Sequence, residues 1–163
     1  IQRACQKHSI PFYQSIAGYR YIKDKMLENN SLFGAEASGH YFFKNNAYCD
    51  NGFIPFLLMW QAVSTSGKTL SELVAPYKEG HHMIEEIKFE FKDKQAILKK
   101  IAKISKIYKK YNQNNLDGLT VEAGEFRLNI RPSNTEPVLR ANLEARTKEI
   151  LKEQEKIINN NLK

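Results

Sequence analysis

The sequence predicts a mixed fold: part of an α/β domain, followed by an α+β domain in which two helices cover a small antiparallel sheet. Three observations support this. Helix-like and strand-like segments alternate in the first half of the chain. Alternating apolar and polar residues recur in several short runs of the second half. Pro76 and Gly80 lie in a polar stretch that separates the two patterns. We therefore predict two domains, residues 1–79 and 80–163.

The first half is rich in helical patterns. The strand-like segments "FYQSI" and "EASGHYFF" lie between these helices, which suggests an α/β unit of which only the later part is present. The longest apolar run, "FIPFLLMWQAV", is interrupted by Pro55 and Gln61; it is too short for a membrane span and predicts a buried helix. Helices are predicted over residues 1–9, 18–30, 50–67 and 69–77.

The second half predicts the order β-α-β-β-β-α. "IEEIKFEFK" alternates apolar and polar residues as a half-buried strand does, and a long helical pattern follows it. Asp117 and Gly118 form a turn signal within residues 112–118. The final helix has Thr147 as its N-cap. The remaining predicted strands are 119–123, 126–130 and 138–145, and the final helix covers 147–162.

Lysines are concentrated in the first helix of this second domain. The chain carries a net charge of +7, and nine lysines lie between Lys88 and Lys110. One face of the helix is an apolar stripe formed by Ile97, Ile101, Ile104, Tyr108 and Tyr111. A lysine face opposite such a stripe is either solvated or binds the phosphate backbone of nucleic acid. Because no aromatic residue is interleaved among the lysines for base stacking, we expect a solvated face and no nucleic-acid partner.

Bulk composition is that of a soluble globular protein. The 163 residues are 42% apolar and 26% charged, and the first residues lack a signal-peptide pattern. Cys5 and Cys49 are far apart and form no CxxC pattern, which excludes a disulfide framework or a zinc site. We expect a cytoplasmic protein with no membrane partner.

The segment "RPSNTEP" (131–137) predicts an anion site between two strands. Ser133, Asn134 and Thr135 offer small hydrogen-bond donors, and their backbone can turn successive N–H groups toward an anion. Arg131 supplies a planar guanidinium that matches a phosphate edge.

A second interpretation of this segment stays open. It is a capped surface turn in which Arg131 pairs with a local carboxylate such as Glu136. Arg140, on the following strand, is either an additional contact to the anion or a solvent-facing side chain.

The segment "GAEASGHYFF" (34–43) is the second candidate site. If it is extended, Glu36, Ser38 and His40 point to the same side. A carboxylate and a hydroxyl at this spacing can hold vicinal sugar hydroxyls, with His40 near enough to exchange a proton. The alternative is a polar edge with a satisfied histidine.

Together these motifs resemble those of the α-D-phosphohexomutases. "GAEASGH" is similar to that family's GExSGH sugar-binding loop, and "RPSNTEP" to its phosphate-binding loop. "AGYRYIKDKM" and "DGLTVEAGEFRLNIRPSNTEPVLRANLEA" resemble the family around these loops. The two loops follow in the family's order, and the phosphomannomutase/phosphoglucomutase branch is the most similar one.

The resemblance implies a piece of a four-domain enzyme, namely the end of domain three and a TBP-like domain four. The family moves a phosphoryl group between positions 1 and 6 of a hexose phosphate through a bisphosphorylated sugar. A phosphoserine in domain one donates the group, and Mg²⁺ bound in domain two assists, so this chain is expected to hold no metal and to be inactive alone. The implied partners are mannose or glucose phosphates, the 1,6-bisphosphate, and the N-terminal domains of the same polypeptide.

The resemblance also implies roles for individual residues. Glu36 and Ser38 would bind sugar hydroxyls, and His40 would act as a general acid or base. The phosphate that does not react would be held by Arg131, Ser133, Asn134 and Thr135, with Arg140 as a further contact.

Three positions bear on which sugar is used. Ala35 stands where the family usually has a glycine, which is a small change. Tyr19 follows Gly18 where enzymes acting on both mannose and glucose often carry a polar residue, so the sugar stays open. A phosphoglucosamine mutase is the alternative within the family; it more often has Gln where this chain has Ala37.

Overall fold

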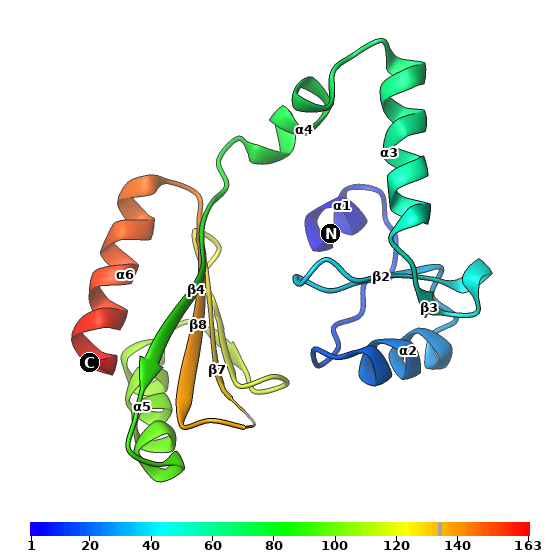
Figure 1. Cartoon of the computed structure of the whole chain (residues 1–163). Coiled ribbons are helices and arrows are strands. Elements are labelled where there is room, and N and C mark those ends of the chain that lie inside the picture. Colours follow the sequence, from blue (N-terminus) through cyan, green and yellow to red (C-terminus); the bar gives the residue numbers. More distant parts are fainter. Residues whose placement is uncertain (134) are drawn as a thin grey trace. The chain divides into compact units, whose positions relative to one another are not determined.

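The computed structural model describes residues 1–133 and 135–163 (Figure 1). It contains two compact units, Ile1–Leu70 and Ser71–Lys163, hereafter unit 1 and unit 2. Among the described residues, no helix combines the length and the apolar character that crossing a bilayer requires.

Unit 1 contains a three-stranded antiparallel sheet in the order β1-β2-β3. The predicted helices of this region are all present, although their ends differ by a few residues. The helix α4 (Leu70–Lys78) begins at the boundary between the units. The elements of unit 1 are α1 (Gln2–Lys7), α2 (Tyr19–Glu28), β1 (Phe33–Ala35), β2 (Tyr41–Phe43), the 3-10 helix η1 (Lys44–Asn46), β3 (Cys49–Asp50) and α3 (Phe53–Ser66).

The core of unit 1 is small. Ile22 and Met26 of α2 pack with Phe42 of β2. Gly34 of β1 lies so close to α2 that an added Cβ would stand 2.6 Å from the Met26 sulfur. The absence of a side chain at Gly34 therefore allows the sheet to approach the helix.

Two predicted strands of unit 1 are wrong or altered. "FYQSI" forms no strand, because the three-stranded sheet uses other segments and leaves it without a pairing partner. The strand expected over 36–43 is present only as β2. Its first part is a hairpin loop, in which Gly39 has a left-handed φ of 88° and its N–H donates to the Glu36 carbonyl oxygen at 3.0 Å. Glu36, Ser38 and His40 therefore do not alternate along a strand.

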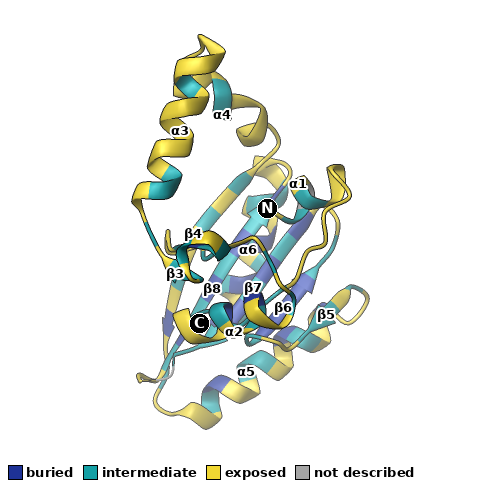
Figure 2. Ribbon diagram, turned by 90° about the vertical axis from the view of Figure 1, so that its right-hand side faces the viewer, coloured by how far each residue is buried: buried dark blue, intermediate teal, exposed yellow. Residues whose placement is uncertain are grey.

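The apolar helix α3 is not buried, contrary to the prediction. None of its described side chains is buried within the chain, and Phe53 and Trp60 are 77% and 62% exposed (Figure 2). A helix that is apolar on all sides normally lies inside a protein. The core of unit 1 lies between α2 and β2, so this unit offers α3 no layer to pack against.

Unit 2 is a five-stranded antiparallel sheet in the order β4-β8-β7-β6-β5, with α5 and α6 on one side (Figure 1). The predicted order of elements is confirmed, with one addition: residues expected to form a turn include the short edge strand β5, which pairs with β6. The elements are β4 (His82–Glu90), α5 (Lys94–Ile107), β5 (Asn112–Asn114), β6 (Leu119–Glu122), β7 (Phe126–Pro132), β8 (Val138–Ala145) and α6 (Lys148–Leu162).

The apolar face of this sheet packs against the two helices. The predicted stripe of α5 is confirmed: Ile97, Ile104 and Tyr108 are buried, and Ile101 and Tyr111 pack against the same core. Alternate residues of β7 and β8 complete it, namely Phe126, Leu128, Ile130, Leu139, Ala141, Leu143 and Ala145.

Side-chain hydrogen bonds fix the helices. Asp93 caps α5 by accepting from the Ala96 N–H at 2.8 Å. Thr147 caps α6 as predicted, accepting from the Ile150 N–H at 3.3 Å. Between the helices, the buried hydroxyl of Tyr108 donates to Gln154 Oε1 at 2.8 Å.

The opposite face of the sheet is polar. Because side chains alternate along a strand, the residues between the core positions point to this side. They are half-buried and come mostly from two strands: Arg127, Asn129 and Arg131 of β7, and Arg140, Asn142 and Glu144 of β8. This polar face carries the second candidate site.

Candidate functional site

The first candidate loop, residues 36–40, connects β1 and β2. The Glu36 N–H donates to the His40 carbonyl oxygen at 2.9 Å and closes the loop. Gly39 supplies the left-handed turn, and an added Cβ there would meet no neighbouring atom. Glu36, Ser38 and His40 thus belong to one tight, solvent-accessible loop.

His40 is paired with an aspartate from the neighbouring strand. His40 Nδ1 lies 2.6 Å from Asp50 Oδ2, while Asp50 Oδ1 accepts from the Tyr41 N–H at 2.9 Å. The hydrogen bond and the negative charge of Asp50 raise the pKa of His40 above 6.5. In turn, the hydrogen bonds from His40 and from the Tyr41 backbone lower the pKa of Asp50 below 3.8.

Sequence reasoning missed Asp50. The available signal was the "CDNG" segment directly before an apolar helix, where Asx residues commonly act as caps. Asn51 is such a cap, accepting from the Phe53 and Ile54 N–H groups at 2.8 and 3.0 Å. Its neighbour Asp50 is thereby held at the start of α3, facing β2.

The second candidate loop follows β7. The Ser133 N–H donates to the Val138 carbonyl oxygen at 2.8 Å, so this amide closes the loop instead of facing an anion. Ser133 Oγ lies 3.5 Å from Thr135 Oγ1 and accepts from the Glu136 N–H at 3.4 Å. Two hydroxyls are thus brought together, whereas Asn134 lies outside the described residues.

Arg131 is positioned by Asp117. Arg131 Nη1 lies 3.3 Å from Asp117 Oδ2, so the partner is not Glu136, which the surface-turn interpretation suggested. The Asp117 backbone is fixed in turn, because Asn129 Nδ2 donates to its carbonyl oxygen at 2.9 Å. Gly118 is required beside it: its φ is 70°, and an added Cβ would stand 2.2 Å from the Ile130 carbonyl oxygen.

Arg140 lies beside Arg131 on the polar face. The two residues are directly opposite in the pairing of β7 with β8. Arg140 Nη1 lies 3.4 Å from Glu86 Oε1, so the side chain is held over the sheet and is not simply solvated. Its Nε is buried and has no hydrogen-bond partner among the described residues.

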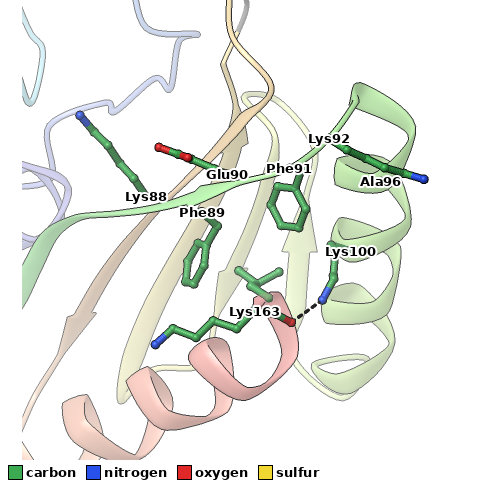
Figure 3. Close-up of a pocket in the computed structure, with 9 residues that line it drawn as sticks. Lys88, Phe89, Glu90, Phe91, Lys92, Ala96, Lys100 and Lys163 are labelled. Atoms are coloured by element: carbon green, nitrogen blue, oxygen red, sulfur yellow. Dashed lines mark hydrogen bonds between the residues drawn. The ribbon is translucent and has the colours of Figure 1, made fainter.

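Two hollows lie in unit 2. One, of about 380 Å³, borders the second candidate loop and is lined by Lys88, Glu90, Phe91, Glu136, Pro137, Val138 and Arg140. The other, of about 630 Å³, lies near α5 and the end of α6 (Figure 3). No residue that the sequence singled out as a site residue lines the larger hollow.

The two candidate loops lie in different units, residues 36–40 in unit 1 and residues 131–137 in unit 2. Cys5 and Cys49 are both free thiols. Within residues 1–133 and 135–163, no three His, Cys, Asp or Glu side chains come together as a metal-binding group.

Comparison with known proteins links both loops to one family. The family model "Phosphoglucomutase/phosphomannomutase, alpha/beta/alpha domain III" matches residues 1–79, and the model of the same family's C-terminal domain matches residues 86–160. A Xanthomonas campestris protein described as "Phosphohexose mutases" is 37% identical over 131 residues, which are 80% of this chain and 29% of that protein.

Two phosphomannomutases are also similar to most of this chain. A phosphomannomutase of Salmonella montevideo is 36% identical over 84% of this chain and 32% of its own length. One of Methanocaldococcus jannaschii is 35% identical over 90% of this chain and 32% of its own. The chain thus spans about a third of the length of these relatives.

A solved structure shows the same fold. It is a phosphoglucomutase/phosphomannomutase family protein from Burkholderia thailandensis, with a TM-score of 0.70 and 23% identity, covering 89% of this chain and 30% of that one. Because both family models match, the predicted family is confirmed: the chain belongs to the phosphoglucomutase/phosphomannomutase family and carries its domain III and C-terminal domain sequences.

Proposed function

We propose that this chain is the C-terminal part of a phosphohexomutase that interconverts hexose 1-phosphates and 6-phosphates. In this role, the 36–40 loop binds hydroxyls of the sugar ring, and the 131–135 loop holds the phosphate that is not reacting. The observation that carries the proposal is the second loop: two hydroxyls lie 3.5 Å apart in the loop that follows Arg131, whose guanidinium is paired with an aspartate.

This loop suits a phosphomonoester. Charge-assisted hydrogen bonds from Arg131 contribute about 1.5–3 kcal/mol each. Ser133 Oγ and Thr135 Oγ1 can rotate their protons toward the anion, because a hydroxyl hydrogen is free to turn. Since the Ser133 amide closes the loop, side chains carry most of the proposed contacts. Asn134 and Arg140 complete the proposed set.

His40 is the proposed proton carrier of the sugar-binding loop. With Asp50 ionised, the Nδ1 proton of His40 faces that carboxylate, and Nε2 is left for the substrate. The raised pKa of His40 favours the protonated ring, so Nε2 can donate a proton to a sugar or phosphate oxygen and recover it in the reverse direction. Glu36 and Ser38 would position the neighbouring hydroxyls.

The rest of the reaction belongs to other domains in this proposal. Magnesium would supply charge stabilisation at the transferring phosphoryl group, but the described residues include no set of ligands for it. The phosphoserine donor would also lie outside this chain. We therefore expect residues 1–163 to be inactive alone and to act with the remaining domains in the cytosol, where thiols such as Cys5 and Cys49 stay reduced.

Calorimetric titration of the chain with glucose 1,6-bisphosphate tests the proposal. Arg131→Ala should weaken binding about ten- to hundredfold, because one or two charge-assisted hydrogen bonds are lost. Arg127→Ala, four residues earlier on the same strand and face, is the matched control and should leave the affinity within about twofold. Equal affinities for wild type and Arg131→Ala would contradict the proposal. So would an absence of sugar-phosphate binding combined with steeply salt-dependent binding of DNA or RNA.

A further inference from the structure

Three cationic side chains lie in a row across the polar face of unit 2. In the strand register, Lys88 of β4 is directly opposite Arg140 of β8, and Arg140 is directly opposite Arg131 of β7. Directly opposite side chains point to the same face, with Cβ atoms about 4.5–5.5 Å apart. We call these three residues the cation row.

Such a row is unfavourable unless anions compensate it, because like charges directly opposite one another destabilise a sheet. Glu86 forms ion pairs with two of the three cations: its Oε1 lies 3.4 Å from Arg140 Nη1 and its Oε2 lies 3.3 Å from Lys88 Nζ. Asp117 forms an ion pair with Arg131. These two carboxylates form the ion pairs of the row, and Glu90 and Glu136 also line the hollow beside Lys88 and Arg140. The buried Nε of Arg140 lacks a hydrogen-bond partner among the described residues.

The row lies at the end of the sheet that carries the candidate phosphate loop. The loop connects β7 to β8 directly after Arg131, and the hollow of about 380 Å³ that borders it is lined by Lys88 and Arg140 together with Glu136 and Pro137. Figure 3 shows that Lys88 and Glu90 project from one side of β4, whereas Phe89 projects from the other. Lys88 is 62% exposed and is thus accessible to a ligand.

We propose that Lys88 is a further cation of the phosphate site, and that Glu86 is its counterion in the free protein. A phosphomonoester dianion of a hexose phosphate, held at the loop, competes with Glu86 for Lys88 and Arg140. The ligand thereby replaces Glu86 as the anion that pairs with Lys88 and Arg140. This inference rests on the proposed function and deepens it, since it names residues outside the family-like motif that set the affinity.

The expected effects have opposite signs for the two partners. Lys88→Gln should weaken binding of glucose 1,6-bisphosphate about three- to fivefold, as expected for the loss of a partly exposed charge. Glu86→Gln should tighten binding about two- to fivefold, because the competing carboxylate is gone. Both effects should shrink as ionic strength rises.

The experiment titrates the full chain with glucose 1,6-bisphosphate by calorimetry, using wild type, Lys88→Gln, Glu86→Gln and Arg131→Ala. Lys99→Gln, an exposed lysine of α5, is the control for the same change of net charge. Circular dichroism confirms that each variant is folded. The inference is supported if Lys88→Gln binds more weakly than Lys99→Gln and Glu86→Gln binds more tightly than wild type.

The inference and the proposed function can fail separately. If Arg131→Ala weakens binding but Lys88→Gln and Lys99→Gln have equal affinities, the proposed role of Lys88 is overturned and the proposed function stands. A Glu86→Gln variant that binds no more tightly than wild type overturns the role of Glu86 as a competitor. If wild type does not bind, or if Arg131→Ala has no effect, the proposed function is overturned together with the inference.

Discussion

The two units differ in how completely each buries its apolar residues. In unit 2, one face of the sheet and two amphipathic helices enclose a common core, from Phe89 at one edge strand to Leu162 near the end of the chain. In unit 1, the core is limited to Ile22, Met26 and Phe42, while α3 is exposed along its length (Figure 2). Unit 2 therefore buries its apolar residues in one shared core, whereas none of the described side chains of α3 in unit 1 is buried.

The largest expected effect is a difference in stability between a substitution in the core of unit 2 and one in α3 of unit 1. Leu143→Ala should destabilise unit 2 by about 2–5 kcal/mol, because it leaves a cavity beside fully buried neighbours. Leu57→Ala in α3 should change stability by less than about 0.5 kcal/mol, since this side chain is 60% exposed. Urea unfolding of both variants measures the difference. Similar losses would show that α3 is as well packed as the sheet.

The second effect concerns the polar contact between the helices of unit 2. Tyr108→Phe removes the hydroxyl that donates to Gln154 Oε1 within a buried site and should cost about 1–3 kcal/mol. Urea unfolding again gives the value. The double variant Tyr108→Phe/Gln154→Leu should recover part of the loss, because the unsatisfied oxygen is removed as well; a double variant less stable than Tyr108→Phe would argue against this cause.

The exposed helix of unit 1 gives a further test. Trp60→Gln combined with Leu57→Gln should reduce binding of an apolar fluorescent dye such as ANS and reduce self-association, because it divides a continuous apolar surface. A double variant in α5, Lys99→Gln/Lys103→Gln, serves as the control and should leave dye binding unchanged. Equal dye binding by wild type and the α3 variant would indicate that α3 is covered.

The smallest expected effect is the pH dependence of stability that comes from the pair of His40 and Asp50. Because the pKa of His40 is raised, its pairing with Asp50 stabilises the protein fully below pH 6.5, and this contribution is lost as the pH rises through the pKa of the folded state. Because the pKa of Asp50 is lowered, its contribution is present above pH 3.8 and is lost as the pH falls through its folded value.

An NMR titration of the His40 ring measures this pairing. In Asp50→Asn, the pKa of His40 should fall toward 6.5, whereas Asp24→Asn should leave it unchanged, because Asp24 pairs with Arg20 instead. An unchanged pKa of His40 in Asp50→Asn would show that the two groups do not interact.

The sequence predicted unit 2 better than unit 1, for a physical reason. In unit 2 the sequence pattern is local: the predicted strands alternate apolar and polar residues, and both helices carry an apolar stripe that the sheet covers. Only β5 was missed, since Asn112 and Asn114 are poor strand formers whose extended form depends on pairing with β6. In unit 1, the "FYQSI" segment and α3 were predicted from their own composition, but strands and apolar helices depend on neighbours that this unit does not provide.

The candidate sites were predicted as segments, but their partners were not. Ser133 and Thr135 stand in the loop that follows Arg131 at the end of β7, as the motif suggested. His40 lies in a tight turn, where an extended strand was predicted. Asp117 and Asp50, which orient Arg131 and His40, are distant in sequence and become neighbours only through strand pairing. The cation row has the same origin, because strand register is not visible in any single motif.

The most direct test of the central claim is a two-dimensional NMR titration of the ¹⁵N-labelled chain with glucose 1,6-bisphosphate. The account predicts that the largest shifts occur at the Arg131 guanidinium, at the amides of residues 133–136 and at Arg140. Shifts confined to the lysine face of α5, or the same pattern of shifts with Arg131→Ala, would contradict it.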